Sequence, residues 1–337
     1  MIPARMLEGF KNLLALLGWE GERLNHGVER VACVGAGLVG QGWAALFALN
    51  GYAVVLEDLT EEKLDKAIGR VEAHMRFLAE AGLGGDVDAA LGRIETTTSI
   101  AEAVAEADFV QESVYESYEV KKAVYAEMDE AAPADAILAS STSGLLMTEI
   151  QKAARRHPER CIVAHPWNPT HLVPLVELCP GELTSEETTR RTYALMEGIG
   201  KVPVVLRKEV PGFIANRLAA ALWREALDLV DKGVASVEDV DRAVRAGPGI
   251  RWAIMGPYLT YHLGGGPGGI EYLMRHIGVK KAKWLETMAK WTVTPESAVE
   301  KAIRGVADMV GDKSLEELER WRDERLVELL RLLWLGR

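Results

Sequence analysis

The feature that most constrains the fold is a glycine pattern that directly follows an apolar run. Val31–Val34 is apolar and leads into Gly35, Gly37 and Gly40, which have GxGxxG spacing, and a helical pattern follows from Trp43 to Leu49. Between a strand and a helix, the first glycine allows a tight turn, the second lets the backbone approach a pyrophosphate, and the third lets helix and strand pack closely. The N-terminus of the helix favours an anion. The expected dinucleotide-binding loop consists of Gly35, Gly37, Leu38, Val39 and Gly40.

An acidic pair ends the next apolar run and indicates which dinucleotide is bound. Ala53–Leu56 is followed by Glu57 and Asp58, about 20 residues beyond the glycines, where an acid accepts hydrogen bonds from the adenosine ribose. A carboxylate there repels a 2′-phosphate, so NAD is expected rather than NADP. Strand periodicity does not decide between the two acids. We favour Asp58 because it lies just past the apolar run.

Apolar runs alternate with helical patterns through the first part of the chain. This alternation predicts an α/β fold, an N-terminal Rossmann domain with a mostly parallel sheet and helices on both faces. A chain of 337 residues exceeds the usual size of one core, so two domains are expected. We place an accessory helix at 1–28, the Rossmann domain at 29–206, and an all-helical domain at 207–337. The expected strands are Val31–Val34, Ala53–Leu56, Phe109–Gln111, Ile137–Ala139, Cys161–Ala164 and Lys201–Leu206.

The region after Leu206 has helical patterns almost throughout. Phe213–Lys232 predicts one long, mostly apolar helix that is buried on several sides and suits a subunit interface, so we expect a homodimer. Gly264–Gly269 is expected to be a loop, because no strand precedes it. Ser314 and Glu317 have the spacing of a capping box and should open the last helix.

Composition excludes several classes of partner. The net charge is −11, from 39 basic and 50 acidic residues, which argues against nucleic acids and anionic membranes because both need a clustered basic surface. No apolar run approaches the roughly 20 residues that cross a bilayer, and no signal segment is evident. Cys33, Cys161 and Cys179 lie in apolar contexts without metal-ligand spacing. We therefore expect buried thiols, no metal and a reducing cytoplasm.

One histidine and one glutamate have the arrangement that acid–base chemistry needs. His165 follows the apolar run Cys161–Ala164, and Glu177 ends a second run, Val173–Val176. If the chain turns at 168–170 and returns, the carboxylate can reach the second imidazole nitrogen and fix its tautomer. This predicts a general base for a hydride-transfer enzyme. The alternative is an ordinary histidine beside a surface glutamate.

These residues belong to a set of motifs that resembles the 3-hydroxyacyl-CoA dehydrogenase superfamily, in particular its branch of L-carnitine and L-gulonate dehydrogenases. The resemblance runs from about Val31 to Leu330. The chain departs from the acyl-CoA enzymes at Pro166-Trp167, where they usually have Phe-Phe, and at Ser141, where they have Asn. At Asn216, where some carnitine-type sequences have Asp, it follows the acyl-CoA pattern. The motifs are GAGLVG at 35–40, SSTSGL at 140–145, HPWNP at 165–169, PLVE at 174–177 and VPGFIANR at 210–217.

The resemblance implies a role for individual side chains. His165 would be the general base and Glu177 its partner, while Ser143 and Asn216 would donate hydrogen bonds around the reacting oxygen. The remaining implied contacts are Asn168 in the same pocket, Glu116, Lys121 and Ser143 near the nicotinamide half of the cofactor, and Asp58 at the adenosine ribose.

Three functions remain open at this point. The first is NAD-dependent oxidation of a small L-3-hydroxy acid of the carnitine or gulonate type, whose distal end Arg251 and Trp252 could bind as an ion-pair donor and an aromatic face. The second is a short-chain L-3-hydroxyacyl-CoA dehydrogenase, although segment 61–82 has four basic and five acidic residues and so offers CoA no net positive charge. The third is a non-catalytic, crystallin-like NAD-binding protein. Trp252 could also be ordinary core.

Overall fold

The computed structural model describes residues 27–278 and 282–335. The chain divides after Phe213 into two compact units, slightly beyond the boundary expected near Leu206, and each is described by itself. The accessory helix expected at 1–28 lies, up to residue 26, outside the described residues.

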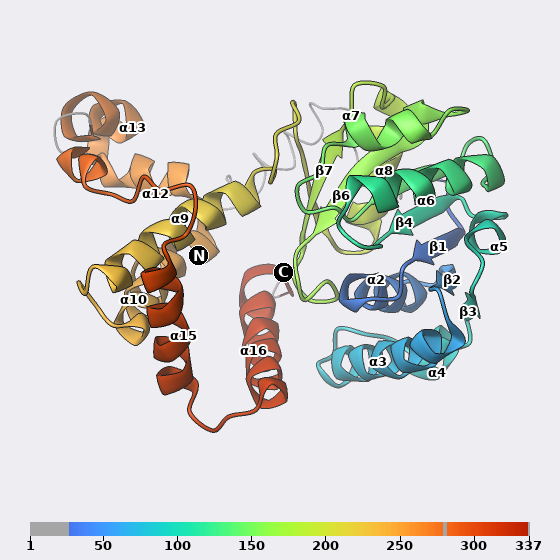
Figure 1. Ribbon diagram of the computed structural model, residues 1–337, viewed down its shortest axis with the longest axis horizontal. Coiled ribbons are helices and arrows are strands. Elements are labelled where there is room, and N and C mark those ends of the chain that lie inside the picture. Colours follow the sequence, from blue (N-terminus) through green and yellow to red (C-terminus); the bar gives the residue numbers. More distant parts are fainter. Residues whose placement is uncertain (1–26, 279–281, 336–337) are drawn as a thin grey trace. The chain divides into compact units, whose positions relative to one another are not determined.

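Eight strands of the described first unit form one sheet in the order β3-β2-β1-β4-β5-β6-β7-β8 (Figure 1). Neighbours pair in parallel except β6 and β7, which are antiparallel. The predicted α/β fold with a mostly parallel sheet is therefore confirmed. The strands are β1 (Arg30–Val34), β2 (Ala53–Glu57), β3 (Ile94–Thr97), β4 (Phe109–Glu112), β5 (Ile137–Ser140), β6 (Cys161–Pro166), β7 (Leu175–Pro180) and β8 (Val202–Val205).

Helices follow most strands of the first unit and make up most of the second. In the first unit they are α2 (Leu38–Leu49), α3 (Glu61–Glu80), α4 (Val87–Leu91), α5 (Ile100–Val104), α6 (Tyr118–Ala131), α7 (Met147–Ile150) and α8 (Glu186–Gly198). In the second they are α9 (Ala215–Asp231), α10 (Val237–Val244), α11 (Ile250–Ile254), α12 (Pro257–Gly264), α13 (Gly269–Tyr272), α15 (Glu296–Val310) and α16 (Leu315–Leu330).

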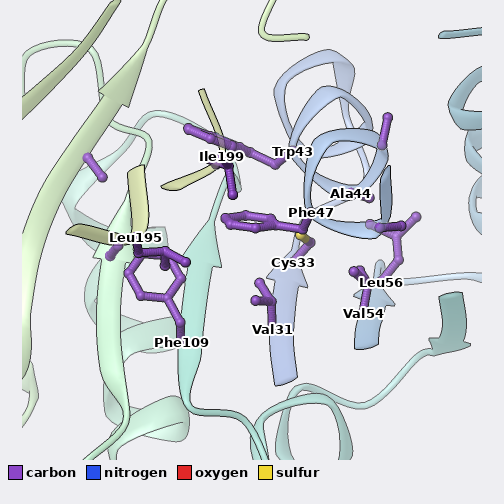
Figure 2. Packing of buried hydrophobic residues seen from close by; sticks show 14 of the residues in the cluster. Val31, Cys33, Trp43, Ala44, Phe47, Val54, Leu56, Phe109, Leu195 and Ile199 are labelled. Atoms are coloured by element: carbon purple, nitrogen blue, oxygen red, sulfur yellow. The ribbon is translucent and has the colours of Figure 1, made fainter. Parts of the chain in front are cut away.

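Both faces of the sheet are buried, because side chains alternate along each strand. In β1, Val31 and Cys33 face the cluster that includes Phe47 of α2, whereas Ala32 and Val34 face the cluster that includes Met128 of α6. Figure 2 shows the first cluster, in which α2 covers the strands. The strands of a parallel sheet that is covered on both faces have continuous apolar sequences, and for this reason most of them could be recognised in the sequence.

Two strands differ from the expectation. β3 carries the sequence Ile-Glu-Thr-Thr at the edge of the sheet, so it has no apolar run to identify it. β7 continues to Pro180, so Glu177 lies inside the strand rather than at the end of an apolar run.

The second unit corrects one prediction and confirms another. Within the single chain α9 is not buried on several sides, since Leu218 and Trp223 are 60% and 59% exposed among the described residues. Ser314 and Glu317 form the predicted capping box at the start of α16. The segment expected as a loop, 264–269, is a tight turn that contains the 3-10 segment Gly266–Gly268 between α12 and α13.

Among the described residues, no helix has the length and apolarity to cross a bilayer.

Candidate active site

The glycine loop has the geometry that a dinucleotide needs. Gly35 has φ +95°, and a Cβ there would lie 2.8 Å from the backbone of Ser113. A Cβ at Gly40 would lie 1.9 Å from the carbonyl oxygen of Gly35, whereas one at Gly37 would meet no atom within 4 Å. Helix α2 begins at Leu38 with no side-chain cap. The loop is therefore tight on its inner side and open on the side where α2 presents its first N–H groups, which fits a diphosphate.

Asp58 and Glu57 have different environments. Asp58 Oδ2 accepts a hydrogen bond from the N–H of Ala36, in the glycine loop, at 3.0 Å, and Lys63 Nζ lies 3.1 Å from Oδ1. Burial alone would raise the pKa of Asp58, but the N–H of Ala36 and the Lys63 ammonium outweigh it and lower the pKa. Glu57 is buried, and this burial, with the charge of Asp58, raises its pKa to about 7. Both acids adjoin the loop, but Asp58 is the partly exposed one and has the lowered pKa.

His165 and Glu177 meet across the one antiparallel strand pair of the described sheet. They are register partners in β6 and β7, and His165 Nδ1 lies 3.0 Å from Glu177 Oε2, with both side chains buried. The carboxylate accepts from the Nδ1–H, so this geometry favours the tautomer that leaves Nε2 as an acceptor. The imidazole also packs against the ring of Phe213, 5.5 Å between centroids.

A pocket of about 280 Å³ lies beside this pair. It brings together six of the residues expected at the site and four that the motifs did not assign. The expected residues are Val39, Glu116, Lys121, Ser143, His165 and Asn168, and the others are Ser113, Val114, Ser141 and Pro166.

A buried ion pair supports the wall of the pocket. Lys121 Nζ lies 2.7 Å from Glu112 Oε1 and 3.4 Å from Glu116 Oε2. Lys121 is 1% exposed and Glu112 is fully buried, and the hydroxyl of Ser140 donates to Glu112 Oε2 at 2.6 Å. Glu112 was not among the expected residues. A carboxylate that ends a buried strand is the sequence signal that could have identified it, because ligands bind at the carboxyl ends of parallel strands.

Glu116 organises the loop that carries Ser143. Its Oε1 accepts from the Thr142 hydroxyl at 2.7 Å, and from the Ser143 N–H and hydroxyl at 2.8 and 3.1 Å. Burial would raise the pKa of Glu116, but these donors and Lys121 lower it. The carboxylate therefore stays ionised and fixes the position of Ser143.

A second lysine holds the turn between His165 and Glu177. Lys201 Nζ donates to the carbonyl oxygens of Thr170 and Val173, the latter at 2.8 Å, and lies 5.3 Å from the centre of the Trp43 ring. Burial lowers the pKa of Lys201 to about 7. This role of Lys201 was not predicted, because a lysine that follows a glycine is normally expected to be exposed to solvent.

Three expected residues lie in the second unit. Asn216 is in the first turn of α9, and Arg251 and Trp252 are in α11, with Trp252 40% exposed. The pocket above is lined by the first unit alone. No group of His, Cys, Asp or Glu in the described part of the chain could hold a metal ion.

Comparison with known families places this pocket in context. Residues 30–210 match the family described as 3-hydroxyacyl-CoA dehydrogenase, NAD binding domain, and residues 212–304 match its C-terminal domain. The chain belongs to the 3-hydroxyacyl-CoA dehydrogenase family. The resemblance seen in the sequence is thereby confirmed, and the expected cofactor, NAD, is confirmed with it.

Individual relatives narrow the comparison. The L-carnitine dehydrogenase of Oceanobacillus iheyensis is 41% identical over 309 residues, which covers 91% of this chain and 98% of the relative. Among solved structures, 5-formyl-3-hydroxy-2-methylpyridine 4-carboxylic acid 5-dehydrogenase, an NAD-dependent dismutase, is similar with TM-score 0.77 and 28% identity over 91% of this chain and 98% of that chain. The (S)-3-hydroxybutyryl-CoA dehydrogenase of Ralstonia eutropha is also similar, with TM-score 0.61 and 30% identity over 70% of this chain and 82% of that chain. The chain is thus an NAD-dependent dehydrogenase.

Proposed function

We propose that the chain oxidises the 3-hydroxyl of L-carnitine, or of a closely similar small L-3-hydroxy acid, to the 3-oxo compound. The observation that carries this proposal is the buried His165–Glu177 pair at the edge of a pocket beside the NAD loop. The similarity to L-carnitine dehydrogenases over most of the chain supports the choice of substrate.

His165 is the general base in this proposal. Its Nε2 takes the proton of the secondary alcohol, and Glu177 stabilises the imidazolium that results. In the reverse direction the same imidazolium returns the proton. When bound, NAD supplies the hydride acceptor. Because the Glu177 contact sets the tautomer before substrate arrives, little reorganisation is needed during proton transfer.

Neutral hydrogen-bonding groups orient the substrate in this mechanism. Ser143, whose backbone N–H is held by Glu116, exchanges its hydroxyl hydrogen bond with Glu116 for one to the reacting oxygen, to which Asn216 also donates. Asn168 completes the polar wall of the pocket. None of them needs to change protonation state. Their contribution is to hold the alcohol in a geometry from which its proton and hydride can leave.

Other residues hold NAD. The N–H groups at the start of α2, which the absence of a side chain at Gly37 leaves accessible, would bind the diphosphate, and Asp58 would accept hydrogen bonds from the adenosine ribose hydroxyls. Glu116 and Lys121 lie on the nicotinamide side. Gly37 is the position where an added side chain would take up the cofactor's space, since it has no protein neighbour within 4 Å.

Arg251 and Trp252 are proposed to bind the distal groups of the substrate. An aromatic face attracts a quaternary ammonium, and a guanidinium pairs with a carboxylate. L-Carnitine carries both groups. Trp252 retains 40% exposure, so its ring is accessible to a ligand.

A short-chain 3-hydroxyacyl-CoA is the second candidate, favoured by the likeness to the 3-hydroxybutyryl-CoA dehydrogenase structure. The test is NADH formation with L-carnitine, L-gulonate, L-3-hydroxybutyrate and L-3-hydroxybutyryl-CoA. We expect the highest kcat/KM for L-carnitine. A preference for the CoA thioester would support the second candidate, and binding of NAD without turnover of any compound would indicate a crystallin-like protein.

We also propose a homodimer that forms through the second unit, and a location in the cytoplasm. α9 exposes Leu218, Leu222 and Trp223, an apolar surface that association would cover. The three cysteines are buried and free, which suits a reducing compartment. Sedimentation at micromolar concentration should give a dimer, and Leu222→Asp should shift it to monomer. A monomeric wild type would contradict the dimer.

A further inference from the structure

Two side chains that line the pocket and two buried ones that contact them form a hydrogen-bond network that no part of the proposed mechanism uses. Ser141 Oγ lies 2.7 Å from Gln111 Nε2, 3.2 Å from Trp43 Nε1 and 2.8 Å from Ser113 Oγ. Gln111 and Trp43 are fully buried. Ser113 and Ser141 are half-buried, and both line the pocket together with His165.

Donor and acceptor counting fixes the direction of this network. The indole nitrogen of Trp43 can only donate. Gln111 Nε2 also lies 3.3 Å from the carbonyl oxygen of Ala164, an acceptor that requires the amide nitrogen, so Gln111 donates to Ser141 as well. Two donors occupy the acceptor sites of Ser141 Oγ. The hydroxyl proton of Ser141 must therefore point to Ser113 Oγ, the one acceptor left among its neighbours in the described chain.

This direction leaves the hydroxyl proton of Ser113 available for a ligand. Within residues 27–278 and 282–335, the side chain of Ser113 has no hydrogen-bond partner other than Ser141. A hydroxyl that already accepts one hydrogen bond is oriented to donate its own proton elsewhere. The pocket is the open space that it lines.

The position of Ser113 indicates which ligand receives the proton. Its N–H donates to the carbonyl oxygen of Val34 at 2.7 Å, and a Cβ at Gly35 would lie 2.8 Å from its carbonyl group. Ser113 thus lies where β1 and β4 meet, beyond their carboxyl ends. The strand order reverses at that point, and the crevice there receives the dinucleotide.

We propose that Ser113 donates a hydrogen bond to an oxygen in the nicotinamide half of NAD, and that Ser141 is the positioning residue that orients the Ser113 hydroxyl. To accept a hydride from a substrate at His165, the nicotinamide half would have to reach from the glycine loop toward His165, and both serines line the pocket there. The proposal concerns NAD binding, so it does not depend on which hydroxy acid is the substrate.

The first test compares NAD and AMP binding by calorimetry, without substrate, in Ser113→Ala. AMP contains only the adenosine half of the cofactor. We expect the Kd for NAD to rise about 3- to 10-fold, the usual effect of one hydrogen bond, and the Kd for AMP to stay unchanged. Ser117→Ala is the matched control, because Ser117 makes no side-chain cap bond and does not line the pocket. An unchanged Kd for NAD, or equal weakening of NAD and AMP, would overturn the proposal.

The second test is a double-mutant cycle with Ser141→Ala, which removes the group that orients Ser113. We expect this variant alone to weaken NAD binding, and the double variant to bind NAD no more weakly than Ser113→Ala, because both changes act through one hydroxyl. Thermal unfolding of each variant without ligand separates this effect from lost stability. Independent, additive losses of NAD affinity would overturn the positioning role of Ser141.

Discussion

His165 and Glu177 are directly opposite each other on antiparallel strands, with Nδ1 of the imidazole 3.0 Å from a carboxylate oxygen. Register partners in a sheet project from the same face, so the backbone pairing itself brings base and partner together. The two strands are joined by a turn that Lys201 holds through two carbonyl oxygens. The pair is therefore positioned by the sheet and the turn, before any ligand binds.

Cofactor selectivity should depend on Asp58 and on the lysine paired with it. Asp58→Ala should weaken NAD binding by about tenfold or more, since hydrogen bonds to a charged group contribute about 1.5–3 kcal/mol. The same change should narrow the preference for NAD over NADP. Lys63→Met should widen that preference, because the unpaired carboxylate repels a 2′-phosphate more strongly. The measurement is kcat/KM for both cofactors.

The control for Lys63→Met is Lys66→Met, which removes a lysine of the same helix that pairs with Glu62. It should leave the ratio of the two specificity constants unchanged. Equal use of NAD and NADP by the wild type would show that the discriminating acid lies elsewhere.

Glu57 should make stability depend on pH in the direction opposite to an ordinary carboxylate. Its pKa is raised to about 7 in the folded chain, against about 4.3 when unfolded. Between these values the folded state binds more protons, so the free energy of unfolding falls as pH rises and the full penalty is present above pH 7. Glu57→Gln should therefore stabilise the protein at pH 8 and have little effect near pH 4.

Urea unfolding at both pH values measures this difference. Glu95→Gln, which alters an exposed carboxylate on the neighbouring strand β3, serves as the control and should show no such contrast. A stabilisation by Glu57→Gln that is the same at both pH values would contradict the account.

Trp252 should affect substrate binding rather than turnover. Trp252→Ala should raise the KM for L-carnitine by roughly 3- to 30-fold, which corresponds to about 0.5–2 kcal/mol for a cation–π contact. The kcat should change little, because the contact would stabilise the bound substrate and the transition state equally. Trp252→Phe keeps an aromatic face and should recover much of the affinity. If Trp252→Ala unfolds instead, the ring is part of the core of the second unit.

The sequence was sufficient where local physics dominates. The strand, turn and helix around the glycines, the six strands expected from apolar runs and the capping box of α16 each depend on residues close together in the chain, and these elements were predicted correctly. β3 was not predicted, because an edge strand with the sequence Ile-Glu-Thr-Thr has no apolar run. The burial of α9 was overestimated. The apolar side chains of a helix indicate that they become buried, but they do not indicate whether the same chain or a second copy buries them.

Contacts between polar side chains on different elements of the fold were the hardest to foresee. Glu112 and Lys121, or Ser113 and Ser141, become neighbours only because β4, β5 and α6 pack beside one another. A polar residue at the carboxyl end of a buried strand marks the ligand edge of the sheet, but it does not specify its partner. The partner follows from strand order and register.

The most direct test of the central claim is the turnover of His165→Gln. With saturating NAD and the best substrate of the panel, its kcat should fall by about 10²- to 10⁴-fold, the usual contribution of a general base, while the Kd for NAD stays within about twofold of wild type, because the imidazole belongs to the proton-transfer step. The kcat of Glu177→Gln should fall less than that of His165→Gln, since the imidazole base itself remains. Near-wild-type turnover by His165→Gln would contradict the account.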